Sequence, residues 1–145
     1  MTYKTNRTYS PEQLQVLAAE LLPDLIRARV GLLSGELGTG KTTFVQGVAK
    51  ALGVDHAVRS PTYTLINEYK VTHPDIDHLI HIDLYRLDHV DSAERAQLGI
   101  DEWLNRPRTL VLIEWPERLE QVPRGLWVEI RVGESGREVR ISNDQ

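Results

Sequence analysis

A glycine-rich segment between a strand and a helix constrains this chain more than any other feature. Residues 35–42 read GELGTGKT, and they directly follow the apolar run VGLLS at 30–34. Apolar residues at helical spacing then occupy 44–52, and Gly53 ends that stripe. The order strand, glycine loop, helix is the setting in which such a loop holds a phosphate group. We therefore expect an α/β domain built around a phosphate site.

The residue types in this loop are those that polyphosphate binding requires. The glycines let successive backbone N–H groups point inward, and the helix that follows adds the positive end of its dipole. Lys41 supplies a charge for the β- and γ-phosphates, Thr42 offers a hydroxyl to Mg²⁺, and Thr43 is placed to touch the α-phosphate. A chance glycine turn is the alternative, and the strand–helix setting disfavours it. The predicted nucleotide-binding residues of the loop are Gly35, Glu36, Leu37, Gly38, Thr39, Gly40, Lys41, Thr42 and Thr43.

Hydrophobic patterns elsewhere predict the rest of the fold. A capping box from Ser10 to Gln13 opens a helix that Pro23 is expected to stop. The apolar run at 110–113 is typical of a buried parallel strand. Further strands are expected at 63–71 and 79–84, short helices at 91–99 and from residue 116, a further turn at 100–104, and an antiparallel hairpin from 127–132 and 137–142. We therefore predict that residues 1–145 form a single domain. Its expected fold is a three-layer α/β P-loop NTPase with a mixed, mainly parallel central sheet and a C-terminal antiparallel hairpin.

Composition narrows the class of protein. The chain has no cysteine, and it has no apolar stretch approaching the roughly 18 residues that a membrane-spanning helix needs. Its first residues lack the apolar core of a secretory signal, so we expect a cytoplasmic protein without a membrane partner. The formal net charge is −4. Because proteins that bind nucleic acid directly usually carry a basic excess, any such role is expected to fall to a partner.

Two acidic residues at strand ends are candidates for holding Mg²⁺ or orienting water. Glu114 ends the strongest apolar strand, and Asp83 follows the run LIHI at 79–82. A carboxylate is costly at the end of a buried strand unless it is paired or serves a metal. The alternative for each is an ordinary acid at the start of a loop. We favour the functional interpretation for both.

The segment SPTYT after the second helix has two interpretations that the residues alone leave open. Threonines in such a position sense the γ-phosphate and Mg²⁺ in nucleotide switches, whereas a proline is equally at home in a plain turn. The candidate switch residues are Ser60, Pro61, Thr62, Tyr63 and Thr64.

Other residues bear on the choice of nucleotide and metal. The guanine-reading Asn-Lys-x-Asp pattern of many GTPases is absent, which favours ATP. None of the five histidines has helical metal-ligand spacing, and surface or strand positions account for them. Trp103 and Trp127 are expected to be core or partly buried aromatics, whereas Trp115 follows Glu114 and is placed to pack near the nucleotide.

The ordered set of motifs resembles one known family. The chain reads, in order, GELGTGKTT at 35–43, SPTYTL at 60–65, HIDLYRL at 81–87, LGID at 98–101 and VLIEWPE at 111–117. Together they resemble the bacterial TsaE family over nearly the whole chain. TsaE is the ATPase component of tRNA N6-threonylcarbamoyladenosine biosynthesis.

This resemblance implies a role for each matching position. Lys41 and the loop amides would hold the ATP phosphates. Lys41 and Asp83 would be the catalytic residues. Thr42 and Glu114 would coordinate Mg²⁺, and Asp83 would orient the attacking water. Thr62 and its neighbours would form a switch over the γ-phosphate. The adenine would lie near Thr8 to Ser10 and the closing hairpin.

The resemblance also implies partners. Members of the family work with TsaD, the threonylcarbamoyl transferase, and with its non-catalytic relative TsaB, and ATP hydrolysis would reset that complex between turnovers. Some relatives carry a longer, more basic C-terminal tail, so we expect contact with tRNA to be indirect.

Two other functions remain possible from the residues. One is a small-molecule kinase, which usually needs an arginine-rich lid. Such a lid is not indicated, because the arginines 86, 95, 106 and 108 are scattered. The other is a nucleotide-dependent switch with negligible turnover. The leading expectation is an Mg-dependent ATPase that is weak alone and stimulated by its partners.

Overall fold

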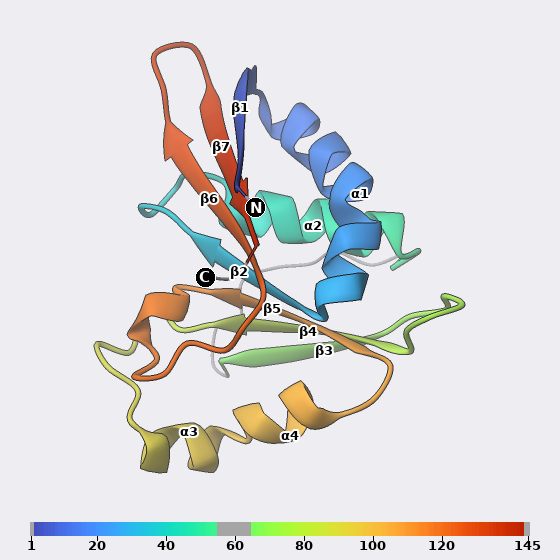
Figure 1. Ribbon diagram of the computed structural model, residues 1–145, viewed down its shortest axis with the longest axis vertical. Helices are drawn as coiled ribbons and strands as arrows, with labels where there is room; N and C mark the ends of the chain where they lie inside the picture. Colours follow the sequence, from blue (N-terminus) through green and yellow to red (C-terminus); the bar gives the residue numbers. More distant parts are fainter. Residues whose placement is uncertain (1, 55–64, 144–145) are drawn as a thin grey trace.

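The computed structural model describes residues 2–54 and 65–143, with side chains from Tyr9 onward (Figure 1). No helix in this part of the chain is long and apolar enough to cross a membrane. In chain order the elements are β1 (Thr2–Tyr9), α1 (Pro11–Ala28), β2 (Val30–Ser34), α2 (Lys41–Ala51), β3 (Ile66–Lys70), β4 (His78–Asp83), α3 (Ser92–Leu98), α4 (Ile100–Asn105), β5 (Thr109–Glu114), the 3₁₀ turn η1 (Pro116–Arg118), β6 (Leu126–Val132) and β7 (Arg137–Ser142).

The strands form one seven-stranded sheet in the order β1-β7-β6-β2-β5-β4-β3. Its central pairings, β6 with β2, β2 with β5 and β5 with β4, are all parallel. The outer pairings, β1 with β7, β7 with β6 and β3 with β4, are antiparallel. Every residue of β5 is buried, as expected of a parallel strand covered on both faces. The predicted mixed sheet and closing hairpin are therefore confirmed.

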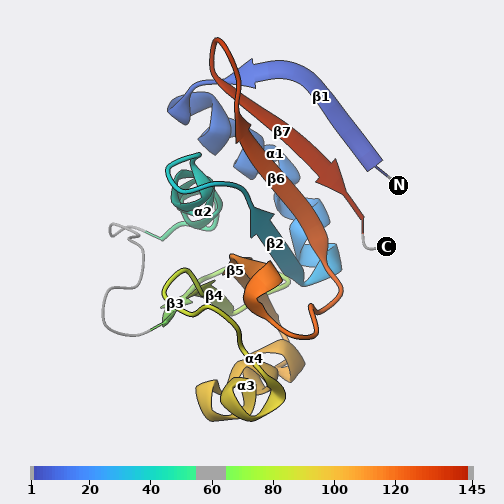
Figure 2. The same cartoon turned by 90° about the vertical axis from the view of Figure 1, so that its left-hand side faces the viewer.

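Helices cover both faces of this sheet, which gives the predicted three layers. Figures 1 and 2 show α1 and α2 on one face and α3 and α4 on the other. Alternate residues of the central strands point to opposite sides: Leu33 packs in the core beneath α1 and α2, whereas Leu32 packs in the core that includes Ile100 of α4. Trp103 and Trp127 pack partly buried against this second core, as predicted.

The first helix begins as predicted but continues past its expected end. Ser10 caps α1 with a complete capping box. Pro23, however, lies inside the helix, so the prediction that it stops the helix is wrong. An internal proline costs about 3 kcal/mol. The extra turn buries Leu25 completely and ends at Arg29, whose N–H donates to the Leu25 carbonyl, and burial of a leucine recovers roughly 1.5–3 kcal/mol.

The edges of the sheet depend on pairing that local sequence does not predict. Residues 2–9 show no apolar alternation, yet they form β1, which pairs with β7 through the backbone. At the opposite edge, the strand expected at 63–71 is β3, Ile66–Lys70, and residues 63 and 64 lie outside the described part. The short helix after Asp91 and the turn that follows it are present as α3 and α4.

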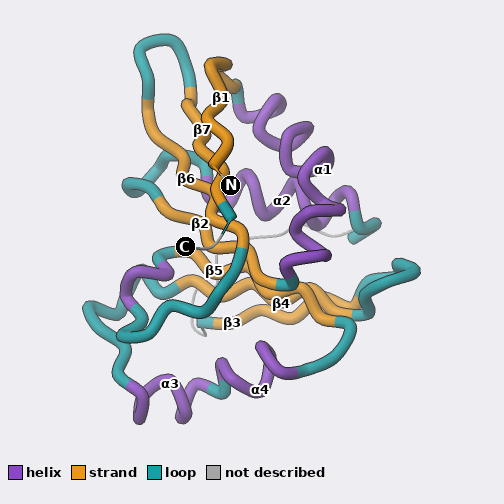
Figure 3. Tube along the Cα trace, viewed as in Figure 1, coloured by secondary structure: helices purple, strands orange, loops and turns teal. Residues whose placement is uncertain are grey.

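The parallel arrangement brings three strand ends to one edge of the molecule. The loops that follow β2, β4 and β5 all lie on the left of Figure 3. The loop after β2 leads into α2, and the neighbouring ends carry Asp83 and Glu114, which are paired in register. Ligand sites of open α/β sheets lie at this carboxyl edge.

Candidate functional site

The glycine loop, residues 35–40, is folded against the body of the protein. Gly35 has a φ of 142° and Gly40 a φ of 118°, in the left-handed range that glycine tolerates. A Cβ on Gly35 would lie 2.3 Å from the carbonyl oxygen of Ile130, and one on Gly40 would lie 2.8 Å from Leu14. Both positions therefore require glycine because of backbone conformation and close packing.

Lys41 is the first residue of α2, and its ammonium group is held by the loop. Nζ donates to the carbonyl oxygen of Gly35 at 2.5 Å and to that of Glu36 at 2.8 Å, and it lies 4.4 Å from the centre of the Trp115 ring. Burial lowers the pKa of Lys41 below its ordinary value, and nearby carboxylates, Glu114 foremost, oppose that shift. The ammonium group that is expected to bind phosphate is thus held by two carbonyl oxygens of the loop.

Thr42 and Glu114 meet although they are distant in the sequence. The Thr42 hydroxyl donates to Glu114, with Oγ1 at 3.1 Å from Oε2 and 3.3 Å from Oε1. Glu114 is only 3% exposed, and its Oε2 also lies 2.5 Å from Nε2 of His81, a fully buried residue. The oxygen atoms of the two predicted metal ligands therefore lie together, and His81 contacts one of them.

Asp83 lies beside Glu114 at the end of the adjacent strand. Burial raises the pKa of Asp83, and the charge of Glu114 raises it further. Its Oδ1 accepts a 3.0 Å hydrogen bond from the backbone N–H of Tyr85, which fixes the carboxylate. An acid with a raised pKa binds a proton more readily, which suits a group that accepts a proton or orients water.

These side chains line one cavity of about 440 Å³. Its walls come from the glycine loop, the start of α2, and the segments after β4 and β5. The lining residues are Leu37, Gly38, Gly40, Lys41, Thr42, Thr43, Leu65, Asp83, Tyr85, Arg86, Glu114 and Trp115. Most of the predicted phosphate, metal and hydrolysis residues thus converge on one site, whereas Gly35, Glu36 and Thr39 of the predicted loop line a second pocket.

The oxygen atoms in this site fit magnesium chemically. Mg²⁺ prefers hard oxygen ligands and usually binds through one or two carboxylates plus substrate phosphates. Thr42 and Glu114, with Asp83 adjacent, supply a hydroxyl and carboxylates of that kind. No group of three or more His, Cys, Asp or Glu side chains in the described part of the chain is arranged to hold a metal by itself. The hydroxyl of Thr42 and the carboxylates of Glu114 and Asp83 are donors of the kind that Mg²⁺ takes.

The aromatic side chain next to Glu114 packs over the site, as expected for Trp115. Its backbone adopts a left-handed conformation with a φ of 60°. The indole ring packs against the ring of Tyr85 in a tilted arrangement, with centroids 5.3 Å apart and an interplanar angle of 48°, and the guanidinium of Arg118 lies 4.9 Å from the indole centre. Trp115 therefore lines the cavity and contacts both Lys41 and Tyr85.

Arg137 of the closing hairpin is a site residue that sequence reasoning missed. Its Nε donates to the carbonyl oxygen of Thr39 at 2.7 Å, and its Nη2 donates to that of Gly38 at 3.2 Å. No motif marks this arginine. Arg86 was also missed, since it was counted among scattered arginines but lines the cavity.

The other arginines considered for a lid are engaged away from the site. Arg95 forms an ion pair with Asp101, and Arg108 forms one with Asp77. Arg106 stacks on the ring of Trp103. Of the four arginines considered, all within the described residues, Arg86 alone lines the cavity, so they are not clustered there.

Several predicted residues lie elsewhere or outside the described part. The hydroxyl of Ser10 accepts a hydrogen bond from the backbone N–H of Gln13 as the cap of α1, and Ser10 is not among the residues lining the cavity. Thr8 belongs to β1, but its side chain is outside the described part, as is the whole predicted switch segment, 60–64. Leu65, the next residue, lines the cavity and accepts a backbone hydrogen bond from Asp83.

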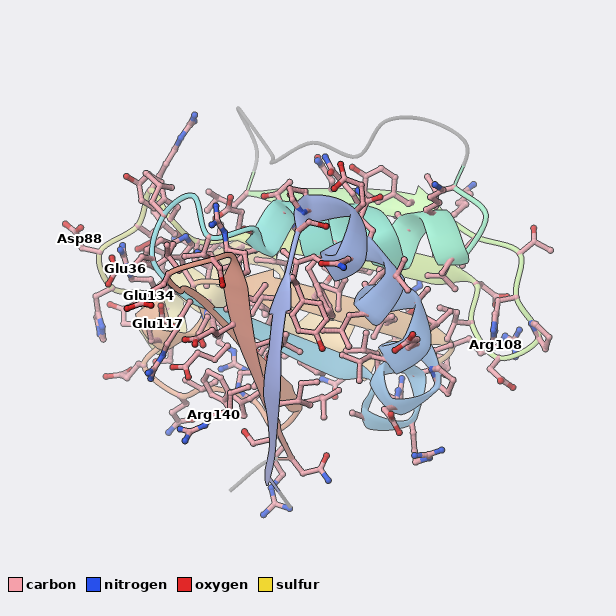
Figure 4. All side chains as sticks on the ribbon, turned by 90° about the horizontal axis from the view of Figure 1, so that it is seen from above. Glu36, Asp88, Arg108, Glu117, Glu134 and Arg140 are labelled. Atoms are coloured by element: carbon pink, nitrogen blue, oxygen red, sulfur yellow. The ribbon has the colours of Figure 1, made fainter. Side chains whose placement is uncertain are left out.

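Exposed acids surround this end of the molecule. Glu36 and Glu117 line a second pocket beside the glycine loop, and Figure 4 shows them with Glu134 on the side opposite Arg108 in that view. All three acids are exposed. None of the three acids lines the cavity, where the glycine loop and Lys41 provide positive potential.

Comparison with known proteins places this geometry in a family. The family model described as "Threonylcarbamoyl adenosine biosynthesis protein TsaE" matches residues 8–141. The chain is 43% identical over 134 residues to the tRNA threonylcarbamoyladenosine biosynthesis protein TsaE of Aquifex aeolicus, covering 91% of this chain and 90% of that protein. The Bacillus subtilis protein of the same name is 36% identical over 139 residues, with coverage of 94% and 83%.

A solved structure has the same fold. The crystal structure of YdiB from Bacillus subtilis superposes with a TM-score of 0.67 at 29% sequence identity. The match covers 100% of this chain and 86% of that chain. The arrangement of strands and helices described above is therefore shared over the whole length of the chain.

Proposed function

This chain belongs to the TsaE family, and from that premise we propose that it is an Mg-dependent ATPase. It would serve as an accessory subunit in the formation of N6-threonylcarbamoyladenosine in tRNA. It would act on the complex of the transferase TsaD with TsaB, and it would meet tRNA only through that complex. Such work would be done in the cytoplasm.

One observation supports this proposal above the others: the groups required for phosphoryl transfer converge on one cavity. Lys41 and Thr42 begin α2, while Glu114 and Asp83 end adjacent strands, and all four line the same space. Phosphoryl transfer depends mainly on positioning and electrostatic stabilisation, so this convergence is what the reaction needs.

The residues would divide the work as follows. Lys41 would exchange its two loop carbonyls for the β- and γ-phosphates, a better partner for a buried ammonium group. Thr42 and Glu114 would hold Mg²⁺, which when bound neutralises charge on those phosphates. Asp83 would orient the attacking water and accept its proton, in keeping with its raised pKa.

Exposed acids outside the cavity are in keeping with the proposed metal dependence. The charges of Glu36, Glu117 and Glu134 would repel a free polyphosphate at long range. A nucleotide that already carries Mg²⁺ has less negative charge and is repelled less. The site is therefore expected to take the metal–nucleotide complex in preference to free ATP.

Hydrolysis by the isolated protein is expected to be slow. Arginine fingers raise phosphoryl-transfer rates by roughly 10³-fold or more, and Arg86 is the one arginine that the described residues bring to the cavity wall. The TsaB–TsaD complex would supply the missing charge or order the segment at 60–64 over the γ-phosphate.

Phosphate release tests the proposal directly. The protein is assayed alone and then with the TsaB–TsaD complex from the same organism, with Mg-ATP in both cases. We expect slow release alone and a clear increase with the complex. Fast release unaltered by the partners would overturn the accessory role. A phosphorylated metabolite in place of free phosphate would indicate a kinase, and tight binding without any product would indicate a switch.

A further inference from the structure

A fully buried histidine outside the predicted site holds the carboxylate of Glu114. Nε2 of His81 lies 2.5 Å from Glu114 Oε2, and the two side chains are 0% and 4% exposed. A carboxylate oxygen can only accept, so the imidazole must donate, and its proton must sit on Nε2. This contact fixes both the tautomer of His81 and one oxygen of Glu114.

The pleat of the sheet explains why this contact forms. His81 pairs in register with Leu112, and Asp83 pairs with Glu114, one step further along the same face. His81 and Glu114 are therefore diagonal neighbours on adjacent strands, and a long side chain can span that separation.

The position of His81 would otherwise suit an apolar residue. Leu79 and Leu112 share this face, and both pack fully buried in the core beneath α1 and α2. Among the described residues, Nδ1 of His81 has no hydrogen-bond partner. An unpaired buried nitrogen weakens the fold, so packing does not account for the imidazole. The polar contact that it makes is with Glu114.

We propose that His81 is a positioning residue for the metal site: it holds Oε2 of Glu114 so that the carboxylate faces Thr42 and the cavity. The inference rests on the proposed Mg–ATP site and concerns only how Glu114 is oriented in it. Ligating carboxylates are generally fixed by such hydrogen bonds, and their loss typically lowers metal affinity about 10- to 100-fold. Without the imidazole, the carboxylate of Glu114 would be free to rotate away from Thr42.

Two substitutions separate positioning from packing. His81→Leu removes the donor but fills the space, whereas His81→Gln keeps an N–H donor on a side chain of similar reach. His78→Leu is the matched control, because His78 lies on the same strand and faces Glu68 away from the site. Circular dichroism checks that each variant is folded.

The first measurement is calorimetric binding of a non-hydrolysable ATP analogue at a series of Mg²⁺ concentrations. We expect His81→Leu to raise the Mg²⁺ concentration for half-maximal binding about 10- to 100-fold, with little change in metal-free binding. His81→Gln should recover most of that loss, and His78→Leu should behave like the wild type. An unchanged Mg²⁺ requirement in His81→Leu, or equal losses in the Leu and Gln variants, would overturn the proposal.

A second measurement needs neither nucleotide nor variant. Nitrogen-15 NMR of the histidine side chains in the metal-free wild-type protein should show a proton on Nε2 of His81. A proton on Nδ1 alone would rule out the hydrogen bond and the proposal with it. If the wild-type protein shows no Mg-dependent nucleotide binding, the proposed function fails. If the wild type binds and only the histidine variants depart from expectation, the positioning role alone fails.

Discussion

The guanidinium group of Arg137 donates a 2.7 Å hydrogen bond to the carbonyl oxygen of Thr39, across 98 residues of sequence. Its second bond, 3.2 Å long, reaches the carbonyl oxygen of Gly38. In a trans peptide the carbonyl and the following N–H point in opposite directions. Because Arg137 binds these two carbonyl oxygens, the N–H groups of Thr39 and Gly40 point away from its guanidinium. The contact also ties the closing hairpin to the phosphate loop.

Arg137→Ala should therefore weaken ATP binding while the domain stays folded. Hydrogen bonds from charged donors contribute about 1.5–3 kcal/mol, so the loss of one corresponds to roughly tenfold or more in affinity. Calorimetry with Mg-ATP measures the effect. Arg140→Ala is the control, because Arg140 is exposed and lies on the other face of the same strand. Equal affinity in the two variants would show that the hairpin does not order the loop.

Lys41→Ala should reduce Mg-ATP affinity about 10- to 100-fold, since it removes a charge-assisted contact with the phosphates. Within the described part of the chain, the ammonium contacts loop carbonyls and an indole face, so circular dichroism should show a folded domain. Lys50→Ala, at an exposed position on the same helix, is the matched control. Wild-type ATP affinity in Lys41→Ala would remove the phosphate-loop assignment.

The two strand-end acids should differ in their effects. Glu114→Gln loses a charged metal ligand but keeps an oxygen facing His81, so it should weaken nucleotide binding only when Mg²⁺ is present. Asp83→Asn should bind normally and slow single-turnover hydrolysis about 10²-fold or more, because an amide activates water poorly. If Asp83→Asn loses the metal-dependent binding and Glu114→Gln does not, the roles are reversed.

The raised pKa of Asp83 predicts a pH-dependent change in stability. Burial and the charge of Glu114 favour the protonated form of Asp83 in the folded state. The stability that this protonation gives to the fold is fully present below the ordinary pKa of 3.8, and it is lost as pH rises through the folded-state pKa. Metal-free Asp83→Asn should therefore melt above the wild type at pH 7, and the difference should shrink as pH falls toward 4. Thermal melts across this range measure it, with Asp88→Asn at an exposed position as the control. A difference in melting temperature that does not vary with pH would contradict the assignment.

Much of the site was predictable because phosphate loops are encoded locally. The glycines, Lys41 and Thr42 lie within one short stretch, and their geometry depends on backbone freedom and on the helix that begins there. Glu114 and Asp83 were predicted because strand ends can be read from apolar runs, and parallel strands bring their ends together. The capping of α1 and α3 was likewise determined by neighbouring residues.

The remaining features depend on contacts between distant segments. Pro23 was expected to end α1, but the helix continues to Ala28, and burial of Leu25 in the core offsets much of the cost of the internal proline. Residues 2–9 become a strand because β7 offers its edge, although their own pattern is polar.

The sequence by itself determined the phosphate loop, the order of most elements and the family, because these follow from short-range patterns and from motifs in a fixed order. Only the tertiary structure decided that His81 supports Glu114 and that Arg137 reaches Thr39. Each of these contacts depends on the register of one strand against another segment, and a shift of one residue would turn the side chain to the opposite face of the sheet. Register is set by the packing of the whole core, so no local pattern in the sequence carries it.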